Sequence, residues 1–391
     1  MLPPFKSLSV NWVDGMKMNK EHFEQTDSYI KDLARDVLAL QLNDLNYGLC
    51  LPVETGSVSL NIKISIDPSK IIRVQLISCR AITSGGSRIE FGHNQSLKLN
   101  ADSDKLLTEY HFDDTKDKLF YVIISTNIHA RIPVGQPDAE ETPPRFPFVS
   151  PEYQLQILPE SQINISQIQY NSLIVGCLAY HSGKMRVIED FIPPCTMVNC
   201  YPLLQESYFK LGNLLGETGK NIAITIDKIH GKSQSTSLVK SCLSLCNVVS
   251  DFVADNMGSY RWIIANQPPV YMLDCFLRLA YKISITLNNL PVKDKEELIN
   301  YICEWVDEVP ADINEKINKL IRAEYQHNDI STTLNIADEF MQMTHNIFLK
   351  LSQLDFIGKK KGERAFVQEK PVVTEQPPPD KGSKGWSFIA E

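Results

Sequence analysis

Phe191-Ile192-Pro193-Pro194-Cys195 divides this chain of 391 residues into two parts with different hydrophobic patterns. Paired prolines end a strand and stiffen the backbone that follows, as is typical of a boundary between domains. Before this stretch apolar residues mostly alternate with polar ones, and after it they recur every three or four residues. We therefore predict an α+β protein with domains over 1–192, 193–357 and 358–391, because the pattern fades again at Gly358.

The first part, 1–192, is predicted to contain one helix followed by a mostly antiparallel β domain. Apolar and polar residues alternate from Val58 to Ile66, which predicts a half-buried strand, and Ser84-Gly85-Gly86-Ser87 predicts a turn. Six prolines interrupt 131–151, so we expect a long ordered loop or extended arm there, without a regular ladder. Further strands are expected over 71–77, 119–124, 153–158, 172–180 and 186–191.

The second part is predicted to be a bundle of mostly antiparallel helices, because the spacers between the helical patterns are short. Residues 221–229 alternate as a strand would, so the helix prediction is weakest there. Asp329 is expected to cap the last helix, since its carboxylate can accept from N–H groups of the first turn. Helices are expected over 201–229, 237–257, 268–289, 293–306, 311–326 and 330–354.

Large apolar side chains crowd the beginning of the chain, between Val10 and Tyr29. Chain termini are usually poorly ordered unless something holds them, so we expect this segment to dock on its own domain or on a partner. Asn19 can cap a helix that starts near Lys20 and ends near Leu42. Its amphipathic stripe consists of Phe23, Ile30, Leu33, Ala34, Val37 and Leu38.

The other end of the chain has a different composition. Lysine, proline and glycine clusters between Lys359 and Gly385 predict a flexible tail with some polyproline II character. Trp386, Phe388 and Ile389 follow it. This cluster fits a short linear motif for a partner and an unremarkable chain end equally well.

Composition excludes several functional classes. The net charge is −8, and no run of lysines and arginines is interleaved with aromatic residues, so we expect no nucleic-acid binding. No apolar stretch approaches the ~18–20 uncharged residues that span a bilayer, and no signal peptide precedes the first helix, so we expect a cytoplasmic protein without direct membrane insertion. Nine cysteines without a CxxC pair predict neither disulfides nor a zinc site.

Candidate chemical motifs are weak. Gly216 to Asn221 resembles a phosphate loop but lacks the required first glycine and the final Ser or Thr. Cys242 and Cys246 share one helix face, where core packing is favoured over metal binding, and acidic residues 113–117 beside His111 fit a solvated turn. We expect no enzyme, cofactor or metal.

Four separated motifs resemble one family in both order and spacing. The first runs from Trp12 to Tyr29, the second is the junction at 191–194, and the third is Tyr325 with His327-Asn328-Asp329. Pro269-x-Tyr271, followed by Leu277-x-Leu279-Ala280, is the fourth. Together they resemble the TssK family, baseplate subunits of type VI secretion systems.

That resemblance implies a β-sandwich "shell", akin to the shoulder of phage receptor-binding proteins, and a helical "neck". It also implies a homotrimer packed about a three-fold axis, which links TssF/TssG wedge proteins at the shell to the envelope complex at the inner face of the inner membrane. The bundle residues that could be either intrachain core or trimer seam are Leu238, Leu245, Val249 and Phe252. Family members carry a C-terminal head, whereas only a short polar tail follows the last predicted helix here, so we expect a variant without the head. We expect the neck, or the tail with Trp386, Phe388 and Ile389, to take over its docking role.

The same resemblance makes the N-terminal aromatic segment a candidate for docking on the shell or the wedge. The residues concerned are Trp12, Met16, His22, Phe23 and Tyr29, with a core position slightly favoured for Trp12. The runner-up interpretation is a phage-type receptor-binding or tail adaptor protein that binds a surface ligand. A third is an enzyme on an unfamiliar scaffold, which predicts a deep pocket with convergent polar groups.

Overall fold

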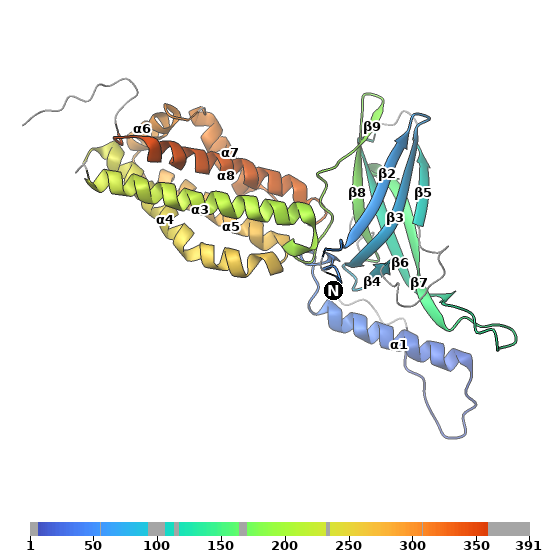
Figure 1. Cartoon of the computed structure of the whole chain (residues 1–391). Helices are drawn as coiled ribbons and strands as arrows, with labels where there is room; N and C mark the ends of the chain where they lie inside the picture. Colours follow the sequence, from blue (N-terminus) through green and yellow to red (C-terminus); the bar gives the residue numbers. More distant parts are fainter. Residues whose placement is uncertain are drawn as a thin grey trace, which may run out of the picture.

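The computed structural model describes residues 7–54, 56–92, 106–112, 117–163, 170–231, 235–306 and 308–358. Figure 1 shows two elongated bodies, a β-sandwich with helix α1 (Lys20–Ala39) beside it and a helical bundle that extends away from the sandwich. The predicted α+β fold class is confirmed.

One sheet of the sandwich is organised around its longest strand. This strand, β3, pairs antiparallel with all four others, which occupy its two edges. The alternation in β2 places Ile62 and Ile64 toward the interior and Lys63 toward solvent, as predicted. The strands are β1 (Gly48–Leu49), β2 (Leu60–Asp67), β3 (Ile71–Ile82), β4 (Arg88–Phe91) and β5 (Leu106–His111).

The second sheet has the order β7-β6-β8-β9 and packs face to face on the first. Aromatic pairs join the two sheets: Tyr110 and Phe120 have ring centroids 5.7 Å apart, and Phe112 and Tyr180 lie 6.0 Å apart. These pairs prefer tilted or edge-to-face geometry, which both adopt. The strands are β6 (Leu119–Val134), β7 (Phe148–Pro159), β8 (Ser172–His181) and β9 (Lys184–Val187).

The expectation that prolines forbid a regular ladder over 131–151 is wrong in part. The β6–β7 ladder continues through Pro133, which pairs with Val149. Beyond Ser125, β6 pairs with β7 alone, because the pairing with β8 ends there. Proline lacks an N–H group, but on a strand edge that faces no other strand this removes no hydrogen bond of the ladder. The extended parts of β6 and β7 can therefore remain a two-stranded ribbon.

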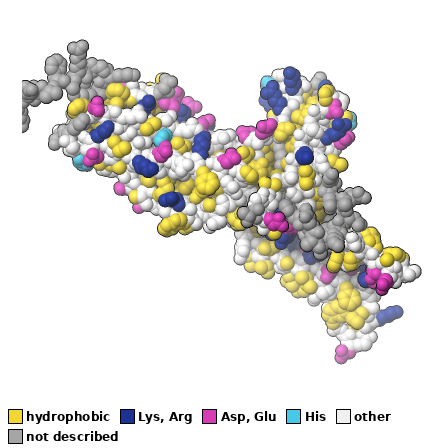
Figure 2. Space-filling view, in the orientation of Figure 1, with side chains coloured by type: hydrophobic (Ala, Val, Ile, Leu, Met, Phe, Trp, Pro, Cys, Tyr) yellow, Lys and Arg dark blue, Asp and Glu magenta, His cyan; other side chains and the backbone are white. Residues whose placement is uncertain are grey.

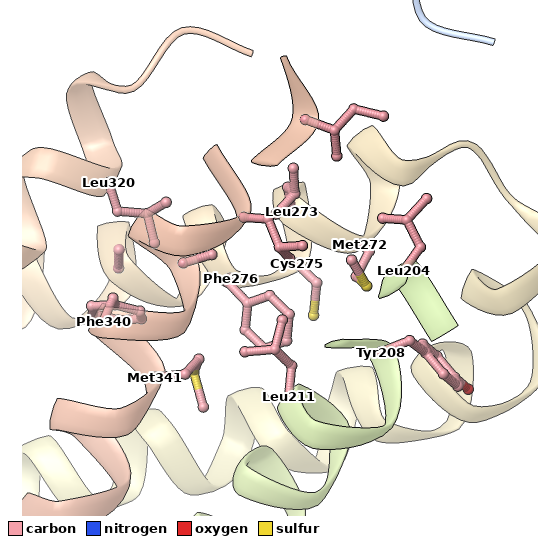
Figure 3. Packing of buried hydrophobic residues seen from close by; sticks show 14 of the residues in the cluster. Leu204, Tyr208, Leu211, Met272, Leu273, Cys275, Phe276, Leu320, Phe340 and Met341 are labelled. Atoms are coloured by element: carbon pink, nitrogen blue, oxygen red, sulfur yellow. The ribbon is translucent and has the colours of Figure 1, made fainter. Parts of the chain in front are cut away.

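The bundle contains the six predicted helices. Residues 221–229 are helical, because Ile222, Thr225 and Ile229 recur at helical spacing and are buried. Phe276 of α5 lies near Leu211 of α3 and Met341 of α8 in the core (Figure 3). The helices are α3 (Pro202–Gly231), α4 (Ser237–Trp262), α5 (Pro269–Asn288), α6 (Val292–Cys303), α7 (Pro310–Arg322) and α8 (Ile330–Gln353).

The apolar residues of α4 could belong to the core of one chain or to a seam between the chains of a trimer. Leu238, Leu245, Val249 and Phe252 are all buried within the chain, so they form intrachain core. By length and composition α4 also passes a test for a membrane-spanning helix, but 44% of its most apolar window is buried in the bundle. Helices in protein cores can have the same length and composition, and α4 packs against α3, α5 and α6.

Helices α3 and α4 pack closely because α3 presents glycines to α4. A methyl group at Gly212 would lie 2.6 Å from Cε1 of Tyr260, and one at Gly219 would lie 2.9 Å from Cγ1 of Val253. Each glycine in a helix interior costs up to about 1 kcal/mol relative to alanine. Gly212 and Gly219 therefore lower the helix propensity of α3 but allow the two helices to pack at a short distance.

Candidate partner-binding face and interdomain joint

Helix α1 begins with the predicted cap. The side chain of Asn19 accepts a hydrogen bond from the backbone N–H of His22 at 3.2 Å, and the Asn19 N–H donates to Nδ1 of His22 at 3.2 Å. This reciprocal capping box satisfies donors that the first turn would otherwise leave free. Gly15 has a φ of +77°, which glycine adopts readily, so it allows the turn that leads into the helix.

The N-terminal segment docks on this helix. The backbone N–H of Ser7 donates to Oδ2 of Asp32 at 2.9 Å, and the side chain of Gln25 donates to the carbonyl of Leu8 at 2.7 Å. The ring of Trp12 lies 5.9 Å from that of His22 and 6.4 Å from that of Phe23. Ser7, Leu8 and Trp12 therefore contact α1 of the same chain, while docking of this segment on a partner stays a prediction.

The polar side of α1 faces the sandwich. Asp32 and Arg35 are the buried residues of α1, and the guanidinium of Arg35 donates to Oδ1 of Asp32 at 2.9 Å. Aliphatic atoms of Arg35 and Leu38 lie against Gly86, in the predicted turn between β3 and β4. Pairing and hydrogen bonding are what make a buried charge tolerable, and this pair has both.

Strand β6 contacts the polar side of α1 closer to the start of the helix. The guanidinium of Arg131 lies 2.9 Å from Oδ2 of Asp27 and 3.3 Å from Oε1 of Glu24. The ammonium of Lys31 donates to the carbonyl of Ile128 at 3.1 Å. Single exposed ion pairs contribute little, but three contacts from one face fix the rotation of the helix about its axis.

The apolar side of α1 consequently faces solvent. Phe23 is 57% exposed and Val37 is 65% exposed, although both belong to the predicted hydrophobic stripe. The other large apolar residues exposed on this side are Ile30 and Leu33. Leu38 lies at its edge, 37% exposed beside Gly86, and Leu40 follows just beyond the helix. Hydrophobic side chains gather along this region in the space-filling view (Figure 2). Large exposed apolar patches mark interaction sites on soluble proteins.

The five candidate residues of this segment lie on or beside α1. Trp12 is 49% exposed and lies outside both hydrophobic cores, so the slight preference for a core position is wrong. Met16, His22 and Tyr29 are half-buried along the same segment. The periodicity of the stripe predicted a helix with a buried apolar side, yet the buried side is the polar one.

A second feature connects the sandwich to the bundle, the interdomain joint formed by residues 47–49, 190–196 and 325–331. The backbone N–H of Leu49 donates to the carbonyl of Pro194 at 2.7 Å, and the N–H of Thr196 donates to the carbonyl of Leu49 at 2.9 Å. Gly48 has a φ of +117°, and a methyl group there would overlap the Pro194 carbonyl. Only glycine fits this close approach.

A buried histidine forms the centre of the joint. One ring nitrogen of His327, Nε2, lies 2.7 Å from the carbonyl of Tyr47, and Nδ1 lies 2.7 Å from the hydroxyl of Tyr325. The hydroxyl of Tyr47 donates to Oδ1 of Asn328 at 2.7 Å. The Tyr47 and His327 rings meet edge to face, with centroids 4.8 Å apart. The last loop of the bundle is thus bonded to the first turn of the sandwich.

Burial decides the protonation state of this histidine. Desolvation lowers the pKa of His327 to about 4, so the imidazole is neutral at neutral pH. The Tyr47 carbonyl can only accept, so Nε2 carries the hydrogen and Nδ1 accepts from the Tyr325 hydroxyl. Burial also raises the pKa of both tyrosines, which therefore stay protonated.

The start of α8 completes the joint. Asp329 is its N-cap and accepts from the N–H of Thr332 at 3.3 Å, as predicted. The hydroxyl of Ser331 accepts from the N–H of Ile192 at 3.0 Å and donates to the carbonyl of Asp190 at 2.8 Å. These bonds across the junction are structural in character.

Chemical sites are not evident in the part of the chain that the structure describes. No group of three or more His, Cys, Asp or Glu residues there could hold a metal ion. Cys242 and Cys246 are buried in the bundle core, and the neighbouring Cys242 together with burial raises the pKa of the Cys246 thiol. The acidic candidates 113–116 and the tail motif Trp386, Phe388 and Ile389 lie outside the described residues.

Solved structures provide the comparison that decides the fold. A crystal structure of TssK matches with a TM-score of 0.51 and 14% sequence identity, over 85% of this chain and 67% of the TssK chain. The chain has a TssK-like fold. No protein-family model and no curated protein matches the chain.

Two further TssK structures are similar at lower scores. TssK from the type VI secretion system of EAEC, in complex with a nanobody, has a TM-score of 0.44 at 12% identity, over 82% of this chain and 96% of that one. TssK in the TssK-TssF-TssG baseplate subcomplex has a TM-score of 0.47 at 12% identity, over 86% of this chain and 99% of that one.

The sequence patterns indicated the bundle side of the interdomain joint, residues 325–329, but not the sandwich side, Tyr47. It singled out Tyr325, His327 and Asn328 as part of a motif, but assigned a role to Asp329 alone. Tyr47 was not singled out, although its carbonyl and hydroxyl bond both His327 and Asn328. These partners are about 280 residues apart in sequence, and no local pattern links them.

Proposed function

We propose that this chain is a structural, non-catalytic subunit of a type VI secretion baseplate. It acts as an adaptor that binds TssF/TssG-like wedge proteins through its sandwich and connects them to the envelope complex, in the cytoplasm at the inner membrane. The observation that carries the proposal is the exposed apolar face of α1, held in place by a buried polar side. The TssK-like fold and the four sequence motifs support it.

The α1 face has the form of a helix that fits a groove. Phe23, Ile30, Ala34 and Val37 follow one another at helical spacing along a single side. Helix-in-groove recognition uses apolar anchors at such spacing, with polar residues at the rim. We propose that the wedge protein supplies the groove, and that Trp12, which lies tilted against His22 and Phe23 in the first turn, extends the contact.

A trimeric assembly is part of the same proposal. Because Leu238, Leu245, Val249 and Phe252 of α4 are buried within the chain, we propose that contacts between copies involve other surfaces of the shell or neck. Light scattering at micromolar concentration is expected to give the mass of three chains. The mass of one chain would contradict the trimer and leave the wedge contact to be tested separately.

The envelope contact is proposed to involve the neck or the tail after Gly358, with Trp386, Phe388 and Ile389 as the docking motif. Deletion of residues 359–391 is expected to abolish envelope docking and secretion while wedge binding persists. Intact secretion after the deletion would contradict this role. Domain limits of 1–192, 193–357 and 358–391 are part of the proposal, and limited proteolysis near the two junctions tests them.

Co-purification tests the function as a whole. The full chain, tagged internally in an exposed loop, is expected to recover TssF/TssG-like proteins from cells that contain the secretion system. Binding to surface glycans without recovery of wedge proteins would instead favour a phage-type receptor-binding protein, and would overturn the proposal.

A further inference from the structure

A surface groove lies between α3 and α4, in the half of the bundle nearer the joint. Its volume is about 870 Å³, and its walls include Phe209 and Ala223 of α3 and Val253, Ala254 and Met257 of α4. Hydrophobic side chains appear on this part of the bundle in Figure 2. The volume lies within the roughly 300–1,000 Å³ of sites that enclose a small ligand or a few side chains.

An aromatic stack ends at the mouth of this groove. Tyr208 lies parallel to Tyr260 with ring centroids 4.9 Å apart, and Phe209 meets Tyr208 edge to face at 5.2 Å. Phe209 itself is 64% exposed. Aromatic rings gain from edge-to-face or offset contacts with further rings, so the exposed ring of Phe209 suits an incoming aromatic side chain.

The groove also carries polar groups at its rim. Asn213 and Glu217 offer acceptor oxygens along α3, while Lys220 and Arg261 offer positive charge. A buried indole requires an acceptor for its N–H group, which a wholly apolar groove would not provide. A tryptophan beside smaller apolar side chains matches this combination of rings, apolar wall and acceptors.

The tail of this same chain begins at the first turn of α4, and the other end of that helix, residues 250–261, forms a wall of the groove. The N–H of Gly358 donates to the Tyr301 hydroxyl at 3.0 Å, and Gly358 contacts Val239 in the first turn of α4. A fully extended chain from Gly358 to Trp386 spans up to about 90 Å at about 3.3 Å per residue. The 26 residues of α4 are only about 39 Å long at about 1.5 Å per residue, so the motif can reach the groove.

We propose that Trp386-Ser387-Phe388-Ile389 docks in the α3–α4 groove of its own chain, with the indole of Trp386 packed on Phe209 and its N–H directed to Glu217 or Asn213. A tether of this length maintains an effective concentration on the order of millimolar, so even a weak contact is occupied. An external partner then has to compete with the groove for the motif. This inference does not depend on the proposed baseplate function.

A labelled peptide of residues 380–391 tests the docking in the full-length protein. The peptide is expected to bind the W386A/F388A double variant at micromolar concentration, by fluorescence anisotropy. The unsubstituted protein is expected to bind it at least about ten-fold more weakly, because its own tethered motif competes. Ala254→Trp, added to the double variant to fill the groove, is expected to weaken binding about ten-fold or more.

Matched controls identify the site. Ala34→Trp places the same substitution on α1, away from the groove, and it should leave peptide binding unchanged. Phe209→Ala is a second groove variant, which removes the aromatic side chain instead of filling the groove. It should also weaken peptide binding, and its far-UV circular dichroism spectrum should be unchanged. Equal peptide binding with and without Ala254→Trp, or no binding at millimolar peptide, would overturn the proposal. So would a loss of oligomer mass in Phe209→Ala without peptide binding, since the groove would then be a seam between copies.

Discussion

Helices α1 and α5 are both amphipathic and have the same length, but they use their two sides in opposite ways. Nine residues of α5 are buried, and all are apolar or small. The buried residues of α1 are an acid and a base, Asp32 and Arg35, and its apolar side faces solvent. A hydrophobic stripe therefore predicts that one side of a helix is buried in a contact. It does not show whether that contact lies within the chain or with a partner.

The energetic difference between the two helices is large. Each fully buried large apolar side chain contributes about 1.5–3 kcal/mol of transfer free energy, so α5 stabilises the bundle itself. On α1 the corresponding free energy is not realised within the chain and is available for binding. Helix α1 is held instead by the Asp32–Arg35 pair and the contacts of Arg131.

The largest expected effect compares one substitution at two sites. Phe276→Ala, in the bundle core, should lower the free energy of unfolding by about 3–5 kcal/mol, through lost transfer free energy and a new cavity. Phe23→Ala, on the exposed side of α1, should change it by less than about 0.5 kcal/mol. Urea unfolding of both variants measures the difference. Similar losses at the two sites would show that α1 is covered within the isolated protein.

The next effect concerns the polar side of α1. Asp32→Ala leaves the buried guanidinium of Arg35 without its carboxylate, which should cost about 3 kcal/mol. The loss should appear as faster amide exchange in α1, while the sandwich strands keep their protection. Asp27→Ala removes an exposed partner of Arg131 and serves as the control, with a loss below about 1 kcal/mol. Unchanged exchange in Asp32→Ala would exclude the proposed anchor.

The joint should be sensitive to acid. The folded pKa of His327 is about 4, below the 6.5 of an unperturbed histidine, so the unfolded chain binds more protons between these two values. Its contribution is complete above pH 6.5 and is lost as the pH falls toward 4, amounting to about 2 kcal/mol between pH 6.5 and 5. Comparing the unfolding free energies of wild type and His327→Gln at both pH values isolates this effect. The same slope in both proteins would contradict it.

The close α3–α4 contact gives a smaller effect. Gly212→Ala places a methyl group against Tyr260 and should cost about 1–2 kcal/mol net, despite the better helix propensity of alanine. A methyl group at Gly258 on α4 would meet no atom of another described element within 4 Å, so Gly258→Ala should stabilise by up to about 1 kcal/mol. Thermal melting separates the two variants by sign. A stabilised Gly212→Ala would show that the helices can move apart freely.

Local patterns predicted most of the helices and strands, because capping, periodicity and prolines act within a few residues. Asn19, Pro269, Pro310 and Asp329 all stand at or beside helix starts, as their chemistry requires. The ladder through Pro133 was missed because sequence does not show which strand edge lacks a partner.

The joint and the orientation of α1 were harder to predict for a related reason. Tyr47 and His327 meet only after both parts of the chain have folded, and neither residue differs locally from an ordinary core residue. The Asp32–Arg35 pair resembles a common surface pair in sequence, since residues three apart on a helix often bear opposite charges. Tertiary packing, which the sequence pattern does not contain, buries that pair.

The central claim is that the apolar side of α1 binds a partner and contributes little to folding. The most direct test is Phe23→Ser/Val37→Ser in the full chain, with the melting temperature and the affinity for purified TssF/TssG-like wedge proteins both measured. We predict an unchanged melting temperature and a loss of affinity of about ten-fold or more. Unchanged wedge binding would contradict the claim, and so would a lowered melting temperature.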